Sequence, residues 1–251
     1  MSKHLTKTPS EIHAMRESGR MLATVLQFLK SRAIPDMSTK DLADLADKEL
    51  KKLGGAATFL GYNGFPDIIC ISINNEVVHG IPRADKIIAD GDIVSLDFGV
   101  TYRGMVTDAA ISFVIGKATR EHRQLVDVTE QSLYAGLEVI HSGIRTGDLG
   151  FAIETVLNKH HYGVVRDLVG HGVGYKLHED PSIPNYGRPG SGVILSKNMT
   201  IAVEPMATLG TYKVYSAPDG WTVLTQDGSW SAHFEHSVLI TEKGCEILTT
   251  L

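Results

Sequence analysis

The order helix, helix, strands is predicted twice along this chain, and this repetition constrains the fold more than any other feature. In the first half, residues 8–11 (Thr-Pro-Ser-Glu) combine a capping threonine, an early proline and a glutamate that can return the cap. Apolar residues then follow at helical spacing to about Ala33. A second helix is expected from Ser38 or Thr39 to Gly54-Gly55.

The second half is expected to repeat this plan. Strands are predicted through residues 73–78 and 93–114, and they end the first half. A helix is then predicted over about 119–141, and another from Thr146 that ends before Gly163. Strand-like segments return after it.

Two similar α+β lobes follow from this pattern. Asp41-Leu42 and Asp148-Leu149 occupy corresponding places in the two halves, which indicates an ancient duplication. No low-complexity segment or linker divides the chain, so we predict a single domain with two similar halves, about 8–115 and 116–251.

A hairpin is predicted near the end of the chain. Gln226-Asp227-Gly228-Ser229 contains an Asp-Gly turn signal, and strand-like residues 221–225 and 230–240 flank it. We therefore expect these two segments to pair.

Three carboxylates interrupt apolar runs that otherwise read as buried strands. They are Asp97 in IVSLDFGV, Glu204 in TIAVEPM and Glu235 in AHFEHSVLI. Charges in such places are rarely tolerated unless they are paired or bound to a metal. The set therefore indicates a buried metal centre rather than solvated surface charges.

A fourth carboxylate, Asp108, lies close to Asp97 along the chain, across the turn-like Tyr102-Arg103-Gly104. If the turn centres on Tyr102-Arg103, the two aspartates lie directly opposite each other on an antiparallel pair. Their Cβ atoms would then be roughly 4.5–5.5 Å apart and their charges would repel. A cation between them would remove that repulsion.

Composition excludes several classes of protein. The net charge is −5 and the pI is about 6.1, with basic residues scattered, which argues against a nucleic-acid reader. The two cysteines, Cys70 and Cys245, form no disulfide framework and no CxxC metal site, which fits a reducing cytosol. Neither a signal peptide nor a membrane span is expected.

Five segments carry motifs in a characteristic order: 70–82 (CISINNEVVHGIP), 91–97 (GDIVSLD), 170–181 (GHGVGYKLHEDP), 202–206 (AVEPM) and 233–241 (HFEHSVLIT). They resemble the type I methionine aminopeptidases of bacterial type, and the resemblance spans nearly the whole chain. It implies the α/β (α+β) "pita-bread" fold, a pseudo-two-fold duplicated arrangement in which helices cover an antiparallel sheet.

The resemblance also implies a ligand set for two metal ions. Asp97 would hold one ion, Asp108 and Glu235 would bridge the pair, and His171 with Glu204 would complete the second site. Oxygen ligands with one imidazole suit divalent Mn, Fe or Co, and the lack of thiolates argues against structural zinc. Two ions roughly 3.5–4 Å apart can share a hydroxide that attacks the peptide carbonyl.

Three residues are expected to carry the catalytic steps. Glu204 is the group expected to move the proton of the attacking water. By resemblance, His79 would hydrogen-bond the peptide nitrogen and His178 would stabilise the oxyanion.

An apolar pocket for the methionine side chain is implied by the same resemblance. It would be lined by Phe59, Tyr62, Phe65, Cys70, Leu177 and Trp221. Contact between a thioether and aromatic rings is worth roughly 0.3–1.5 kcal/mol, which makes such a slot a sensible selector for methionine. Phe59 and Leu177 differ from the residues common in some bacterial members, and this leaves the width of the pocket open.

The implied function is removal of the initiator methionine from the N-termini of nascent polypeptides when the second residue is small. A cytoplasmic monomer with a transient ribosome contact is expected. Two alternatives share the scaffold. A proline-specific aminopeptidase or dipeptidase has the same ligands but generally carries an additional N-terminal domain, and a non-catalytic binding protein has lost metal ligands.

Overall fold

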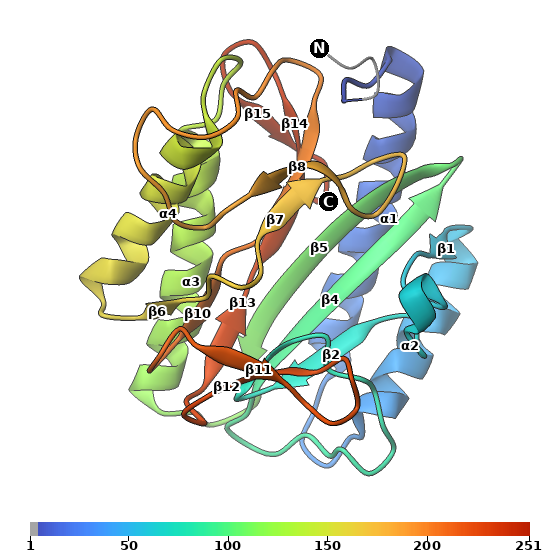
Figure 1. Ribbon diagram of the computed structural model, residues 1–251. Coiled ribbons are helices and arrows are strands. Elements are labelled where there is room, and N and C mark those ends of the chain that lie inside the picture. Colours follow the sequence, from blue (N-terminus) through green and yellow to red (C-terminus); the bar gives the residue numbers. More distant parts are fainter. Residues whose placement is uncertain (1–4) are drawn as a thin grey trace.

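The computed structural model describes residues 5–251, in which helices pack against one side of a large antiparallel sheet (Figure 1). The helical elements are α1 (Pro9–Arg32), α2 (Thr39–Leu53), the 3₁₀ turn η1 (Tyr62–Gly64), α3 (Arg120–Glu138) and α4 (Thr146–Lys159). The strands are β1 (Ala56–Ala57), β2 (Cys70–Ile73), β3 (Glu76–Val78), β4 (Ile93–Tyr102), β5 (Met105–Val114), β6 (Gly163–Val164), β7 (Gly170–Gly172), β8 (Glu179–Ile183), β9 (Thr200–Val203), β10 (Met206–Thr208), β11 (Val214–Ser216), β12 (Val223–Thr225), β13 (Ser231–His233), β14 (Glu235–Ile240) and β15 (Cys245–Ile247).

Local capping explains where the first two helices begin. At α1, the backbone N–H of Glu11 donates to Thr8 Oγ1 at 3.4 Å, and Glu11 Oε2 accepts from the backbone N–H of Thr8 at 2.7 Å. Ser38 and Asp41 make the same exchange at α2. Gly54, at a left-handed φ of 81°, ends α2. The predicted helix boundaries of the first half are confirmed.

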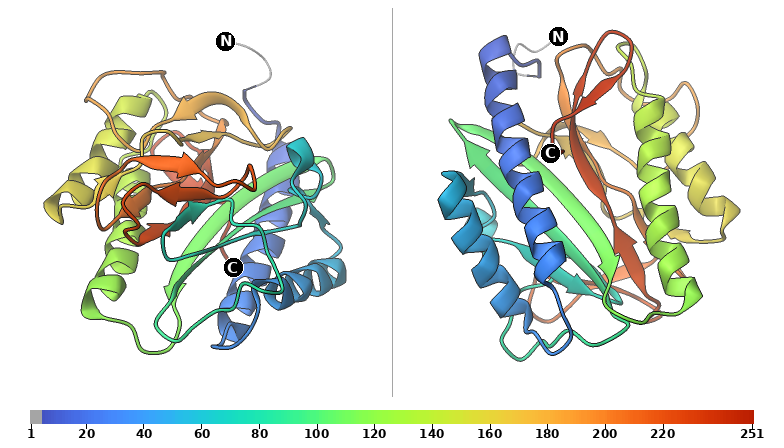
Figure 2. Two further views of the ribbon diagram at one scale, coloured as in Figure 1. Left: turned by 60° about the horizontal axis from the view of Figure 1, so that its bottom comes forward. Right: turned by 180° about the vertical axis from the view of Figure 1, so that it is seen from behind.

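The large sheet has the order β1-β4-β5-β14-β9-β7-β8, with β2 also paired to β4 and β15 to β14. All four α-helices cover one face of it (Figure 2). Because successive side chains of a strand point to opposite faces, Leu96 and Phe98 are buried in the core formed with α1 and α2. Asp97, between them, faces away from the helices. The site lies on that other face.

The duplication is visible in hydrogen bonds that recur at one constant offset in residue number. At the start of α2, the backbone N–H of Thr39 donates to Lys86 O, and at the start of α4 that of Thr146 donates to Val193 O. The same offset relates the bond from Ile88 N–H to Met37 O with the one from Leu195 N–H to Ile144 O. Both halves therefore lead from the helices into the sheet through the same connection.

The expected direct opposition of Asp97 and Asp108 is wrong. In the β4–β5 ladder, Asp97 pairs with Ala110 and Asp108 pairs with Gly99. The turn is Arg103-Gly104, both at left-handed φ (49° and 77°), as a tight two-residue hairpin turn requires. The two carboxylates are therefore diagonal neighbours, and they still share one face of the sheet.

The expected hairpin around residues 226–229 is also wrong. β12 pairs with β3 and β11, whereas β13 pairs with β10 in another small sheet. Asp227 does organise a turn there, since its carboxylate accepts from the backbone N–H groups of Thr211 and Ser229. Instead of pairing with each other, β12 pairs with β3 and β13 pairs with β10. Both partners are distant in the sequence and belong to separate small sheets.

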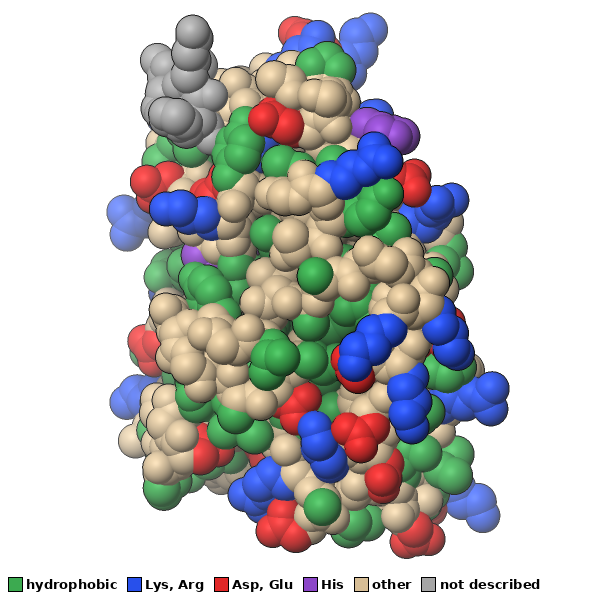
Figure 3. Space-filling view, turned by 90° about the vertical axis from the view of Figure 1, so that its right-hand side faces the viewer, with side chains coloured by type: hydrophobic (Ala, Val, Ile, Leu, Met, Phe, Trp, Pro, Cys, Tyr) green, Lys and Arg blue, Asp and Glu red, His purple; other side chains and the backbone are tan. Residues whose placement is uncertain are grey.

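Surface charge is mixed on the face shown in Figure 3, where acidic and basic side chains are interspersed. Several such pairs lie along α2, including Lys51 with Asp47 at 2.6 Å and Lys52 with Glu49 at 2.8 Å. Among residues 5–251, no helix is both long enough and apolar enough to cross a membrane.

Candidate metal centre

Five adjacent strands of the large sheet bring the predicted ligands together. In sheet order, β4, β5, β14, β9 and β7 carry Asp97, Asp108, Glu235, Glu204 (directly after β9) and His171. The register continues across the strands, since Glu235 pairs with Ala110 and His171 with Ala202. The alternation of the strands therefore turns all five side chains to one face.

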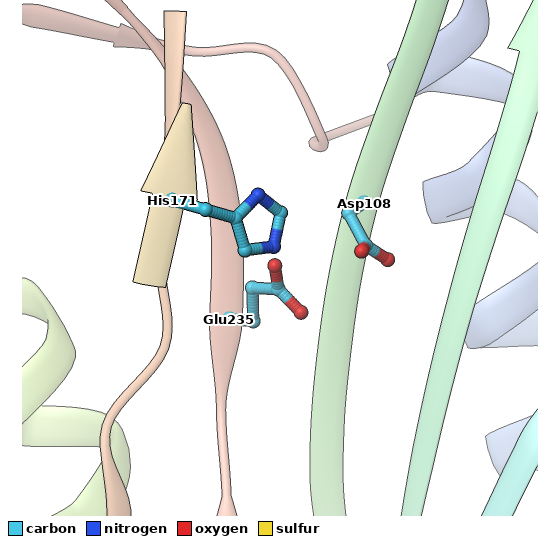
Figure 4. A group of neighbouring side chains, drawn as sticks. All are labelled: Asp108, His171 and Glu235. Atoms are coloured by element: carbon cyan, nitrogen blue, oxygen red, sulfur yellow. The ribbon is translucent and has the colours of Figure 1, made fainter. Parts of the chain in front are cut away.

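The side chains of Asp108, His171 and Glu235 come from three strands of this row and lie close together (Figure 4). One potential ligand atom of each lies within 4.8 Å of the other two. His171 Nε2 is also 3.4 Å from Glu204 Oε1. His171 Nδ1 lies 2.9 Å from the backbone oxygen of Gly172, to which it can donate. That bond leaves the Nε2 lone pair facing the carboxylates, as a metal ligand requires.

Burial makes this concentration of carboxylates costly. Asp97 Oδ1, Asp108 Oδ1 and Glu235 Oε1 are buried and have no hydrogen-bond partner among residues 5–251. Burial raises the pKa of Asp108 to about 7. Burial, followed by the charges of neighbouring carboxylates, raises the pKa of Asp97, Glu204 and Glu235 well above the ordinary range. A divalent cation would satisfy these oxygens and restore their ionised form, so the donor set fits such an ion.

Two buried polar side chains hold the main chain at these carboxylates. Ser237 Oγ accepts from the backbone N–H of Asp108 at 2.9 Å and donates to its carbonyl at 2.8 Å. Asn185 Nδ2 donates to the carbonyl of Glu204 at 3.0 Å. Pro205 follows Glu204 and has no N–H, so the strand ladder stops there. The Asn185 side chain, rather than a neighbouring strand, then satisfies the Glu204 carbonyl.

His79, His178 and Tyr62 line the same pocket as the carboxylates. His79 adopts a left-handed φ of 58°, which is rare for a residue other than glycine and is found at functional sites. Burial, and then the charge of a protonated His178, lowers the pKa of His79 to about 4. Burial also lowers the pKa of His178, so both rings are neutral at pH 7. Tyr62 OH lies 2.7 Å from His178 Nδ1.

An apolar pocket of about 240 Å³ opens onto the carboxylates and histidines. Its apolar wall consists of Phe59, Tyr62, Phe65, Cys70, Leu177 and Trp221. Phe65 packs edge to face against Trp221 with ring centroids 5.2 Å apart, and against Phe59 at 6.4 Å. Gly99 admits Phe59, because a Cβ at Gly99 would lie 2.7 Å from the ring. Burial keeps Cys70 protonated by raising its pKa well above the usual value.

A wider, open cleft of about 790 Å³ adjoins the pocket at His171 and His178. Its other walls include Tyr175, Lys176 and Asp180, so both signs of charge line it. A ligand held in the smaller pocket therefore has room to continue outward over β7 and β8.

His233 is a residue of this site that the sequence analysis missed. It is buried, both ring nitrogens lack a hydrogen-bond partner among residues 5–251, and Nε2 lies 3.9 Å from Glu204 Oε2. Burial, followed by the charge of His79, lowers its pKa to about 3. The sequence could have indicated this residue. His233 lies two residues before Glu235, and residues two apart in a strand point to the same face.

All thirteen residues predicted for the site line one cavity. The five metal-binding candidates, the histidines His79 and His178, and the six pocket residues all face the same 240 Å³ space. The structure therefore brings together side chains that the sequence places from Phe59 to Glu235.

Comparison with known proteins agrees with this geometry. A model of metallopeptidase family M24 matches residues 13–242. The chain belongs to this family. Membership of M24 implies use of a divalent metal, and the group of Asp108, His171 and Glu235 offers a place for one.

Relatives within M24 carry the name expected from the motifs. The chain is 44% identical to the methionine aminopeptidase of Clostridium acetobutylicum and to methionine aminopeptidase 1 of Bacillus subtilis, over 98% of each chain. The crystal structure of methionine aminopeptidase from Thermotoga maritima matches with a TM-score of 0.97 and 45% identity, over 98% of this chain and 99% of that one. The resemblance to type I methionine aminopeptidases, as metallo-aminopeptidases, is confirmed.

The M24 fold is also shared with proline-specific enzymes. Prolidase from Pyrococcus furiosus matches with a TM-score of 0.79 over 98% of this chain and 66% of the prolidase, at 21% identity. This likeness concerns the fold, and with the duplicated sheet and its helices it confirms the predicted pita-bread architecture.

Proposed function

We propose that this chain removes the N-terminal methionine from polypeptides whose second residue is small, and that residues 1–251 act as a single catalytic domain. The observation that carries the proposal is the junction of a largely apolar pocket with buried carboxylate oxygens that have no hydrogen-bond partner within residues 5–251. A volume of about 240 Å³ suits one side chain, and the carboxylates that line the same pocket would hold the metal.

The ligands in this proposal are Asp97, Asp108, His171, Glu204 and Glu235, arranged for two divalent ions of the Mn, Fe or Co type. When bound, the two ions supply an activated water and polarise the scissile carbonyl. The neutral Nε2 of His171 and the oxygen-rich remainder are donors that such ions accept.

The chain's own residues then handle protons and charge. Glu204 accepts the proton of the attacking water, because its carboxylate lies beside His171 among the proposed ligands. His178 donates to the oxygen that gains negative charge, and His79 hydrogen-bonds the peptide nitrogen. Both histidines line the pocket mouth as neutral rings, the state in which each can donate one hydrogen bond.

Selection of methionine rests on the aromatic wall. An unbranched thioether packs against the aromatic wall that Phe65 and Trp221 form together, whereas branching at Cγ forces off-rotamer geometry that costs on the order of 0.5–1.5 kcal/mol. Methionine is therefore preferred over leucine without excluding it. The second residue must be small because His79 and the pocket wall crowd the metal centre.

The adjoining open cleft gives the rest of the polypeptide a way out, which suits substrates as long as nascent chains. We place this activity in the cytoplasm, in a monomer that meets the N-termini of nascent polypeptides through transient ribosome contact. No direct reading of nucleic acid is involved.

Cleavage of three peptides under one metal condition tests the proposal. Met-Ala-Ser is expected to be cleaved fastest, Leu-Ala-Ser more slowly, and Met-Lys-Ser not detectably. Equal rates for Met-Ala-Ser and Met-Lys-Ser would refute the small-neighbour rule. A preference for Xaa-Pro peptides whatever the first residue would support a proline-specific enzyme, and absence of cleavage with bound metal would support a binding protein.

A further inference from the structure

The hydroxyl of Tyr62 makes a contact that a role in the pocket wall does not require. Its oxygen lies 2.7 Å from His178 Nδ1, and the two rings are 5.4 Å apart at 51°. The short distance is that of a strong hydrogen bond between a hydroxyl and an imidazole nitrogen. Tyr62 thus joins the apolar pocket to the proposed oxyanion donor.

We propose that Tyr62 is a positioning residue that fixes the tautomer and the direction of His178, an inference that rests on the proposed function. In a neutral imidazole one nitrogen carries the proton and the other accepts. With the Tyr62 hydroxyl donating to Nδ1, the proton of His178 resides on Nε2. Nε2 is the nitrogen left free to donate to the substrate. Without the hydroxyl, either tautomer is available and only one of them can stabilise an oxyanion.

The backbone around Tyr62 holds this hydroxyl in a fixed place. Gly61, Asn63 and Gly64 all adopt left-handed φ (79°, 48° and 88°), so the chain reverses tightly on both sides of Tyr62. The backbone N–H of Tyr62 donates to Phe59 O at 2.9 Å, and that of Phe65 donates to Tyr62 O at 2.9 Å. Both phenylalanines belong to the pocket wall, so the turn is anchored at its two ends.

His178 needs such support, since it precedes β8 and its side chain is exposed on the cleft side. The His171 ring packs against it edge to face, with centroids 4.3 Å apart. That contact limits the position of the ring but does not choose its tautomer. The Tyr62 hydroxyl contacts only Nδ1, and by donating to it favours the tautomer that carries its proton on Nε2.

A consequence is that side-chain selection and catalysis share one residue. The ring of Tyr62 faces the pocket that would receive methionine, and its hydroxyl faces the group that stabilises the transition state. A methionine side chain packed against the ring would hold the hydroxyl against His178. A short first residue such as alanine would leave that hydroxyl less constrained.

The first test is Tyr62→Phe, which keeps the ring and removes only the hydroxyl. Outer partners that orient metal-ligating histidines matter by about 10–100-fold, and a comparable fall in kcat for Met-Ala-Ser, with little change in KM, is expected here. Tyr186→Phe is the matched control, because its hydroxyl bonds the carbonyl of Arg166 and lines neither cavity. A change in KM with unchanged kcat would overturn the proposal and leave Tyr62 as pocket wall alone.

A double-mutant cycle with His178→Ala separates positioning from general damage. If Tyr62 acts through His178, adding Tyr62→Phe to His178→Ala lowers kcat no further. Multiplying losses would overturn the proposal, since they would mean that Tyr62 acts independently of the histidine.

¹⁵N spectra of histidine-labelled protein loaded with Zn²⁺ give a readout that does not depend on turnover. His178, assigned with His178→Ala, is expected as the Nε2–H tautomer in the wild type and as a mixture in Tyr62→Phe. A wild-type Nδ1–H tautomer would overturn the inference. Failure of the wild type to cleave Met-Ala-Ser would instead count against the proposed function, and the spectra would still report the tautomer.

Discussion

In the first half of the molecule, Asp97 and Asp108 lie on one hairpin, whose two ten-residue strands are joined by Arg103-Gly104. In the second half, Glu204 directly follows β9 and Glu235 begins β14. These two strands are neighbours in the sheet, but four short strands, β10 to β13, separate them along the chain. A local ladder fixes the first pair. The second pair depends on contacts from distant parts of the sequence.

The difference extends to how each carboxylate is supported. The main chain at Asp97 continues in a regular strand on both sides. The main chain at Glu204 leaves the ladder at Pro205 and is held by Asn185, from the loop that follows β8. Ser237 ties the two halves together, because it bonds the backbone of Asp108 from β14. The two halves thus both contribute strands to the sheet, whereas the supports of the candidate metal ligands differ between them.

The largest effect is expected at the group of Asp108, His171 and Glu235, to which both halves of the chain contribute, so the two halves should be equally sensitive there. Asp108→Ala and Glu235→Ala are each expected to abolish hydrolysis and metal binding, since each deletes one member of the group formed with His171. Metal content by mass spectrometry and cleavage of Met-Ala-Ser are the measurements. Asp127→Ala, at an exposed position, is the control. Normal activity in Asp108→Ala would end the dinuclear interpretation.

Asn185→Ala tests the dependence of the second half on long-range support. It removes the donor to the Glu204 carbonyl, and leaving a buried acceptor unpaired costs about 1–3 kcal/mol. Because groups that orient ligands matter by about 10–100-fold, metal affinity and kcat/KM are expected to fall in that range. Thermal unfolding measures the loss of stability, and metal titration measures the loss of metal affinity. Asn158→Ala, on the exposed side of α4, serves as control. Wild-type metal affinity in Asn185→Ala would show that Glu204 needs no such support.

The pH dependence of the metal-free protein gives a smaller effect that both halves share. Burial raises the pKa of Asp108 from 3.8 to about 7, so between these values the folded state holds a proton that the unfolded state releases, and stability falls as pH rises. Asp97, Glu204 and Glu235 act in the same direction.

Buried histidines oppose this loss of stability with rising pH, but only below pH 6.5. The pKa values of His79 and His171 are lowered from 6.5 to about 4, so stability gained from them rises between those values and is constant above. The melting temperature of metal-free protein is therefore expected to fall as the pH rises from 6.5 through the folded-state pKa of Asp108 near 7, and the other three carboxylates act in the same direction. Each kcal/mol lost lowers it by about 2–4 °C for a chain of this size. Saturating metal should abolish the slope, and a slope that persists with metal would assign it to other groups.

The smallest effect is expected at the turn of the local hairpin. Gly104 has a φ of 77°, and within residues 5–251 no atom would lie within 4 Å of a Cβ added there. Gly104→Ala therefore adds only backbone strain, roughly 1–2 kcal/mol. Stability measured by denaturant should drop by that amount while kcat/KM stays at the wild-type value. A loss of activity would mean that the turn also sets the register of Asp97 and Asp108.

Much of the architecture follows from the sequence alone. Capping at Thr8 and Ser38 and the glycine after α2 are local signals, and they set helix boundaries that packing does not alter. Period-two alternation placed Asp97 and Asp108 on the face opposite their apolar neighbours. Ordered motifs indicated the family, and the residues they named face one cavity.

Tertiary structure decided what those local signals leave open. Register depends on which two residues form the turn, and a shift of one position made Asp97 and Asp108 diagonal rather than opposed. The Asp-Gly turn at residues 226–229 forms no hairpin, because its flanking strands pair elsewhere: β12 pairs with β3, and β13 pairs with β10. Asn185, Ser237, His233 and the bond between Tyr62 and His178 join segments far apart in the chain. Hydrogen bonds and desolvation act over a few ångströms in space, so only the folded arrangement determines which polar groups meet.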